Sequence, residues 1–141
     1  MRVLTFLFLT LLIFACNKLK NHPIPSLPFE TEINLTLPSY QDLQGISGSA
    51  YAQGGVKGLV IYRKSQNEFV CFDRMATTEN AAECDSGLVM DSDNFLNLND
   101  PCSDAVYSLY DGSVVSGDVE FGLRHYLTQW DGNTKLRIYN N

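Results

Sequence analysis

The stretch Asp100-Pro101-Cys102-Ser103-Asp104-Ala105-Val106-Tyr107-Ser108-Leu109-Tyr110-Asp111-Gly112-Ser113-Val114-Val115-Ser116-Gly117 decides how the fold of this chain is interpreted. It opens with proline, cysteine and small polar residues, a composition that favours tight turns. An apolar segment around Val106 then predicts a short strand, and Gly112 marks a further turn. We therefore expect a loop, a short strand and a second turn in close succession.

The same organisation extends in both directions along the chain. Apolar and polar residues alternate with period two in short segments, each bounded by turn residues. Because no segment shows a sustained helical period, the fold class is all-β, a small sandwich or open barrel. The expected strands cover residues 33–37 (ended by Pro38), 49–51, 59–62, 69–72, 123–130 and 135–139.

Turn signals join several of these strands into hairpins. The glycine-rich residues 52–58 lack the strand-to-helix context and the Gly-Lys-Ser/Thr sequence of a phosphate loop, so they predict a hairpin turn. Residues 64–67 connect the next pair of strands. Asp131-Gly132-Asn133 is a strong hairpin signal between the last two strands.

Residues 1–15 have the composition of an export signal. Arg2 precedes an apolar run over residues 3–14, which is too short to span a membrane as a helix. Ala15 followed by Cys16 resembles the bacterial lipobox, in which the cysteine is acylated and becomes the new N-terminus. The alternative is an ordinary secretory signal that is cleaved elsewhere and leaves an incidental cysteine.

We expect three regions: the signal over 1–15, a tether over 16–29 and a β domain over 30–141. Three prolines within residues 23–28 preclude a helix and favour an extended tether that holds the domain away from the membrane. His22 is expected to be a solvated residue of this tether. No later stretch approaches about 20 apolar residues, so the lipid would anchor the protein rather than a spanning helix.

The net charge of the chain limits the classes of macromolecule that it is expected to bind. The formal net charge is -6, and removal of residues 1–15 takes away only Arg2 and leaves -7. Acidic residues are scattered and no cluster of lysine and arginine is present, so nucleic acid is a poor partner.

Three cysteines remain once Cys16 carries lipid, which in an oxidising compartment predicts one disulfide and one free thiol. Cys71 lies in an apolar strand pattern, where a free cysteine behaves as a small buried hydrophobe. Cys84 and Cys102 both lie in turn-rich segments. They are therefore the pair that we expect to be bridged.

The opening stretch resembles the second cluster-binding loop of a Rieske iron-sulfur domain, whose pattern is Cys-Pro-Cys-His-Gly-x-x-Phe. Asp100 stands at the first ligand cysteine and Ser103 at the ligand histidine. Residues 69–74 resemble the strand that leads into the first cluster loop, and residues 122–139 resemble the closing hairpin. With the lipobox, the chain is similar to exported Rieske-like lipoproteins of Bacteroidota, which implies a small β-sandwich or open barrel with a cluster-loop subdomain.

The resemblance implies a degenerate domain. A Rieske centre needs two cysteines and two histidines to hold its 2Fe-2S cluster. In the first loop Ala76 stands at the cysteine position and Thr78 at the histidine position, so no 2Fe-2S cofactor is expected. Cys84 and Cys102 match the disulfide that ties the two loops together in many family members.

Two functions of different classes follow. The first is a non-catalytic interaction or structural module that has no cluster and binds an unidentified protein of the cell envelope. The alternative is a Rieske-type electron-transfer protein, which the residues at the ligand positions disfavour. Enzymatic activity is not expected, because His125 is the only candidate histidine base in the β domain and it lies on an expected strand.

The acidic loops offer a further alternative, a calcium site. Asp91-Ser92-Asp93-Asn94 begins like a calcium-binding loop. Leu96 and Cys102, however, occupy the positions that require glycine and a bidentate glutamate, so an EF-hand is excluded. An irregular calcium site remains open beside the simpler interpretation of solvated acidic loops.

We predict that Cys16 is acylated and that the protein is anchored in the outer membrane at its periplasmic face. Asn17 replaces the aspartate that commonly retains lipoproteins at the inner membrane, and residues 17–20 carry no acidic cluster. Treatment with globomycin should block maturation, and the mass of the N-terminal peptide should include the lipid. An unmodified Cys16 thiol in the exported protein would contradict the prediction.

Overall fold

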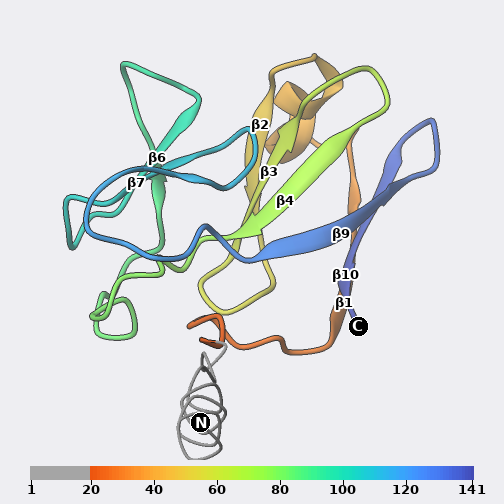
Figure 1. The fold of residues 1–141 in the computed structure, drawn as a ribbon. Coiled ribbons are helices and arrows are strands. Elements are labelled where there is room, and N and C mark those ends of the chain that lie inside the picture. Colours follow the sequence, from red (N-terminus) through yellow and green to blue (C-terminus); the bar gives the residue numbers. More distant parts are fainter. Residues whose placement is uncertain (1–19) are drawn as a thin grey trace, which may run out of the picture.

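The computed structural model describes residues 20–141, so the expected signal and Cys16 lie outside the described residues. Strands form two antiparallel sheets, and the all-β class is confirmed (Figure 1). The larger sheet has six strands in the order β1-β10-β9-β4-β3-β2, and the smaller has four in the order β5-β6-β7-β8. The bounds are β1 (Phe29–Asn34), β2 (Ser49–Ala52), β3 (Leu59–Arg63), β4 (Phe69–Asp73), β5 (Val89–Met90), β6 (Asn97–Asn99), β7 (Val106–Ser108), β8 (Val114–Ser116), β9 (His125–Trp130) and β10 (Lys135–Asn140).

The three hairpins expected from the turn signals are present. β2 pairs with β3 across the glycine-rich segment, β3 pairs with β4, and β9 pairs with β10. β1 closes the other edge by pairing with β10, from Phe29 opposite Asn140 to Asn34 opposite Lys135. The order of the large sheet therefore brings the two ends of the domain together in adjacent strands.

The first strand ends earlier than the sequence pattern predicted, at Asn34 rather than near Leu37. The Asn34 side-chain oxygen accepts hydrogen bonds from the backbone N–H and the hydroxyl of Thr36, 2.9 and 2.8 Å away. Such a local side-chain bond competes with strand pairing and starts a turn. A 3-10 helix that the sequence analysis did not expect, η2 (Pro38–Gln44), follows and begins with Pro38.

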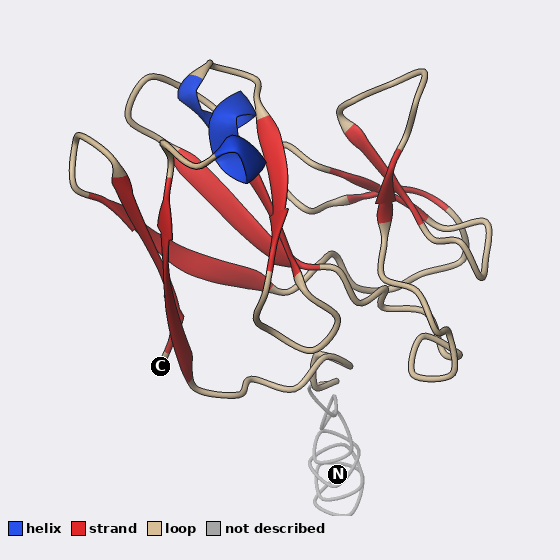
Figure 2. Ribbon diagram, turned by 180° about the vertical axis from the view of Figure 1, so that it is seen from behind, coloured by secondary structure: helices blue, strands red, loops and turns tan. Residues whose placement is uncertain are grey.

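η2 lies against β2 at one end of the larger sheet (Figure 2). Its Leu43 is fully buried, together with Leu35 from the preceding turn. The guanidinium of Arg63, at the end of β3, donates to the carbonyl oxygens of Leu43 and Gln44. The helix is therefore fixed by a buried leucine and by hydrogen bonds from the sheet.

β3 and β4 are buried on both faces, which explains their nearly continuous apolar sequences. Alternate side chains of each strand face opposite apolar clusters. One cluster fills the curved inner face of the larger sheet and includes Leu59, Ile61, Phe69 and Cys71. The other lies between the two sheets and includes Val60, Tyr62, Val70 and Phe72. These central strands thus join the two halves of the core.

A buried carboxylate links the strands to the loops that follow them. Asp73, at the end of β4, is fully buried. Its oxygens accept hydrogen bonds from the backbone N–H groups of Val56 (2.6 Å), Lys57 (3.2 Å) and Met75 (2.8 Å). The Tyr126 hydroxyl on β9 donates a fourth bond of 2.7 Å. The β2–β3 turn, the end of β4 and β9 are therefore held at one point.

The prediction of an extended, solvated tether over residues 16–29 is wrong for residues 20–29, the part that the structure describes. Ile24 is fully buried, and Arg124 donates a hydrogen bond to its carbonyl oxygen. His22 is half-buried rather than solvated, and its Nε2 lies 3.0 Å from the carbonyl oxygen of Gly122. The prolines do exclude a helix here, but burying the Ile24 side chain favours packing against the domain. Figure 1 shows this red and orange segment running along one end of the domain into β1.

The domain therefore begins before residue 30, and β1 itself starts at Phe29. Lys20 forms an exposed ion pair of 2.6 Å with Glu120, in the segment that precedes β9. Over residues 20–141, no helix is long and apolar enough to cross a membrane.

We predict that Tyr126→Phe lowers the free energy of unfolding by about 1.5–3 kcal/mol, because it removes a hydrogen bond to the buried Asp73 carboxylate. Burial, and then the hydrogen bond and charge of Asp73, raise the pKa of Tyr126. A raised phenol pKa gives stability below the ordinary value near 10 and loses it as pH rises further. Urea unfolding at neutral and alkaline pH measures both effects.

Tyr139→Phe on β10 is the matched control, because Tyr139 lies half-exposed at the edge pair and removal of its hydroxyl should change stability by less than about 0.5 kcal/mol. Equal losses in the two variants would contradict the role assigned to Tyr126.

Candidate functional site

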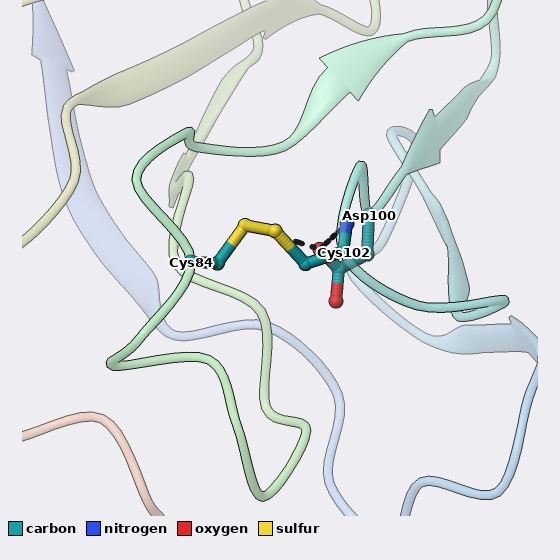
Figure 3. Close-up of side chains that lie close together, drawn as sticks. All are labelled: Cys84, Asp100 and Cys102. Atoms are coloured by element: carbon teal, nitrogen blue, oxygen red, sulfur yellow. Dashed lines mark hydrogen bonds between the residues drawn. A yellow bond between two sulfur atoms is a disulfide. The ribbon is translucent and has the colours of Figure 1, made fainter.

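Two loops meet beside the smaller sheet and form the candidate site. One connects β4 to β5 over residues 74–88, and the other connects β6 to β7 over residues 100–105. A disulfide joins them between Cys84 and Cys102, with a Cα–Cα distance of 5.9 Å (Figure 3). The expected pairing is confirmed, and Cys71 is free and buried in β4.

Asp100 occupies the centre of the site and is only 6% exposed. Its carboxylate accepts hydrogen bonds from the Ser103 hydroxyl (2.7 Å), the Cys102 backbone N–H (3.0 Å) and the Thr78 hydroxyl (3.3 Å). The first two bonds close the turn of the β6–β7 loop, and the third reaches across to the β4–β5 loop. A buried carboxylate without such donors would be strongly destabilising.

Three of the four positions singled out by the sequence, Thr78, Asp100 and Ser103, are thus in direct contact. The fourth, Ala76, is 5% exposed and belongs to the apolar cluster between the sheets. The chain separation between Thr78 and Asp100 is 22 residues, so this contact depends on the fold. Cys16, the expected lipidation site, lies outside the described residues.

Two residues that the sequence analysis did not single out position the first loop. The buried hydroxyl of Tyr107 on β7 accepts a hydrogen bond of 3.0 Å from the Thr77 backbone N–H. The Thr77 hydroxyl donates to the carbonyl oxygen of Phe121, in the segment before β9. The period-two pattern places Tyr107 inward, but its partner lies 30 residues earlier, and no local signal identifies it.

The glycine-rich turn also supports the loop that carries Cys84. The Lys57 ammonium donates to the carbonyl oxygens of Ala81 and Cys84. Gly55, in the same turn, has a φ of 60°, and a Cβ atom there would lie 2.4 Å from an Asp73 carboxylate oxygen. Glycine is therefore required for both its backbone conformation and its close approach to Asp73.

The disulfide limits the reactions that the two sulfur atoms at the centre of the site can undergo. Cys84 Sγ lies 4.0 Å from Asp100 Oδ1. A disulfide sulfur carries no proton, so this is a close contact rather than a donated hydrogen bond. The thiolate is the nucleophile and metal ligand of cysteine, and neither sulfur can supply it while the disulfide is intact.

A cleft of about 610 Å³ adjoins the site. The hydroxyl-bearing residues Thr78 and Ser103 line its wall. Its lining within the described residues also includes the acidic residues Glu79, Asp104, Asp118 and Glu120. Within the described residues this lining offers carboxylates and hydroxyls and no imidazole or thiol.

Asp91 and His125, which the sequence analysis considered for calcium binding and for catalysis, make local contacts. The Asp91 carboxylate accepts hydrogen bonds from the backbone N–H groups of Asp93 and Asn94 and from the Asn99 side chain. These bonds, the one from Asn99 foremost, lower the pKa of Asp91. The carboxylate thus closes a turn. His125 lies on β9 beside the ring of Phe72, with ring centroids 5.4 Å apart, and burial lowers its pKa.

No protein-family model matches this sequence, and no curated protein matches it. The fold and the site define the class of protein as an all-β domain in which a disulfide and a buried carboxylate join two neighbouring loops.

We predict that the double variant Cys84→Ala/Cys102→Ala loses about 3 kcal/mol of folding free energy, because the unfolded chain regains the entropy of a loop closed across 18 residues. Urea unfolding measures the loss. Peptide mapping of the unaltered chain without reduction should give one linked pair of peptides, which contain Cys84 and Cys102. Cys71→Ala is the control, which should leave the peptide map unchanged. A linked peptide that contains Cys71 would contradict the assignment.

Proposed function

We propose that this chain is an exported, lipid-anchored protein whose β domain is a degenerate Rieske-like module without a cluster. In this proposal the domain acts as a non-catalytic interaction or structural module at the cell envelope. The observation that carries the proposal is the direct contact among Thr78, Asp100 and Ser103. These side chains bond to one another at the positions where the resemblance requires ligands for iron.

The chemistry of the four positions supports this interpretation. A Rieske cluster takes two thiolates on one iron and two neutral imidazoles on the other. Ala76 has no donor atom, while Thr78 and Ser103 direct their hydroxyl groups to the Asp100 carboxylate. The oxygens of Asp100 are engaged by these donors and by the Cys102 N–H. The contacts form a set whose polar groups satisfy one another.

The retained disulfide favours a role that depends on the shape of the loops. Cys84 and Cys102 hold the two loops together although no metal is expected between them. A constraint of this kind preserves a surface for binding as well as it preserves a cluster site. The proposed partner is a protein of the envelope, and the acidic, scattered charge of the chain makes nucleic acid a poor alternative.

The proposed location is the periplasmic face of the outer membrane, through a lipid on Cys16. Ile24 is buried against the domain and His22 is half-buried, so the segment that would follow the lipid lies along the domain surface. Only a few residues would separate the lipid from Lys20, so the domain would lie close to the membrane surface. The segment between β8 and β9 would then also lie near the membrane, because Lys20 forms an ion pair with Glu120 in that segment.

The second candidate function is electron transfer by a Rieske-type 2Fe-2S cluster. It would require the two described histidines, His22 and His125, to serve as ligands. His22 instead accepts a hydrogen bond at Nδ1 from the Ile24 backbone N–H, and its Nε2 lies 3.0 Å from the carbonyl oxygen of Gly122, while His125 lies on β9. The candidate remains testable by direct reconstitution.

We predict that the full chain, with its disulfide intact, takes up no 2Fe-2S cluster when iron and sulfide are supplied. Ala76 and Asp100 replace the thiolates, and Thr78 and Ser103 replace the imidazoles. Iron and acid-labile sulfide analysis, visible absorption and electron paramagnetic resonance of the reduced sample provide the measurement. A stoichiometric cluster with a Rieske spectrum would overturn the proposal and establish the electron-transfer alternative.

The variant Ala76→Cys/Thr78→His/Asp100→Cys/Ser103→His is the positive control for the reconstitution, because it restores all four ligand types. A second control is the same reconstitution after the disulfide has been reduced. Iron held there by Cys84 and Cys102 alone would lack imidazole ligands and would not give the Rieske spectrum.

A further inference from the structure

We propose that reduction of the disulfide converts Cys84, Asp100 and Cys102 into a binding site for a thiophilic divalent cation of the zinc type. One ligand atom from each residue, the two sulfurs and a carboxylate oxygen, lies within 4.8 Å of the others. The inference goes beyond the proposed function and does not rest on it, because it requires neither the lipid anchor nor a Rieske-like origin.

The donor set suits zinc. Thiolates and carboxylates are among its regular protein ligands, at distances of about 2.3 Å for sulfur and about 2.0–2.2 Å for oxygen. Tetrahedral angles at that distance place two sulfurs about 3.8 Å apart. The sulfurs, which are covalently joined in the disulfide, must therefore separate. Cys102 is exposed, so its side chain has room to turn while Cys84 stays buried in its loop.

The electrostatics of the reduced site favour a cation. Asp100 is buried, and none of the ion pairs found over residues 20–141 includes it. Its charge is balanced only by the donors of Thr78, Cys102 and Ser103. Two thiolates beside this carboxylate would place three negative charges within a few ångströms, so the two thiols stay protonated in the absence of a counter-ion. A divalent cation displaces these protons and balances the negative charge of the ligands.

The chemistry is balanced by a dithiol reductant. The disulfide gains two electrons and two protons and becomes two thiols, while the reductant forms its own disulfide. Binding of the cation then releases the two thiol protons. The sulfurs and the carboxylate supply three ligands, and water completes the fourth position on the exposed side of Cys102. Metal thus replaces the covalent bond as the link between the two loops.

The remaining described cysteine does not compete for the cation. Cys71 is fully buried in the centre of the larger sheet, and burial raises the pKa of its thiol. It lies in the apolar cluster on the inner face, whereas the disulfide joins the two loops. Cys71→Ser is therefore a thiol-matched control that removes one cysteine without touching the site.

Metal titration of the full chain in a Cys16→Ser background tests the proposal. A phosphine reduces the disulfide by taking oxygen from water and delivering two electrons and two protons, and it is then removed without air. Titration with Co²⁺ should give sulfur-to-cobalt charge-transfer absorption that saturates at one metal per chain, and Zn²⁺ should displace the cobalt. The oxidised chain should show no such absorption.

Variants distinguish a metal site that uses Asp100 together with both cysteines from metal binding by free thiols alone. Asp100→Asn should weaken binding by at least about tenfold, since loss of a ligand exceeds the loss of an outer-sphere partner. Cys84→Ser/Cys102→Ser should abolish the absorption, and Cys71→Ser should leave it unchanged. Asp104→Asn, in the same loop but exposed, should also leave it unchanged.

Circular dichroism recorded alongside each titration shows whether the reduced chain stays folded. If it unfolds, zinc should restore the native spectrum, and failure to do so would overturn the proposal. The proposal would also be overturned if the reduced protein bound metal no better than Cys84→Ser/Cys102→Ser, or if Asp100→Asn bound as tightly as the unaltered chain.

Discussion

The structure depends on the buried carboxylate of Asp73. Its oxygens accept four hydrogen bonds, three from backbone N–H groups and one from Tyr126. These donors come from the β2–β3 turn, the end of β4 and β9, which are far apart in sequence. Because a buried charge must be satisfied in full, the turn and the strand ends are fixed relative to one another at this point. The approach of the Gly55 backbone to Asp73 is part of the same constraint.

The rest of the architecture extends from β3 and β4, which are packed on both faces. One face completes the inner core of the larger sheet, and the other supports the smaller sheet. The β4–β5 loop leaves directly from Asp73, so the hydrogen bonds that end the strand also fix the start of this loop. Lys57 continues this support by binding the carbonyl oxygens of Ala81 and Cys84.

A second buried carboxylate, Asp100, organises the site itself. It receives Thr78 from one loop and Ser103 from the other, beside the disulfide that joins them. Asp73 accepts mainly from backbone N–H groups of the framework, together with the Tyr126 hydroxyl, whereas Asp100 accepts from two side-chain hydroxyls on different loops and from one backbone N–H. The carboxylate and disulfide together make the loops one unit. We propose that this unit carries a binding surface in the oxidised state and binds a cation in the reduced state.

The sequence by itself determined the all-β class, the three hairpins and the disulfide pairing, because alternation, turn residues and cysteine context are local signals. The end of β1 at Asn34 follows from a local signal, the hydrogen bonds between Asn34 and Thr36, which the alternation of apolar residues concealed. Only the tertiary structure decided that His22 and Ile24 pack on the domain. It also brought Asp100 to Thr78 and Asp73 to Tyr126. Each of these contacts joins residues distant along the chain, and their stability comes from shared burial, which a short window of sequence does not contain.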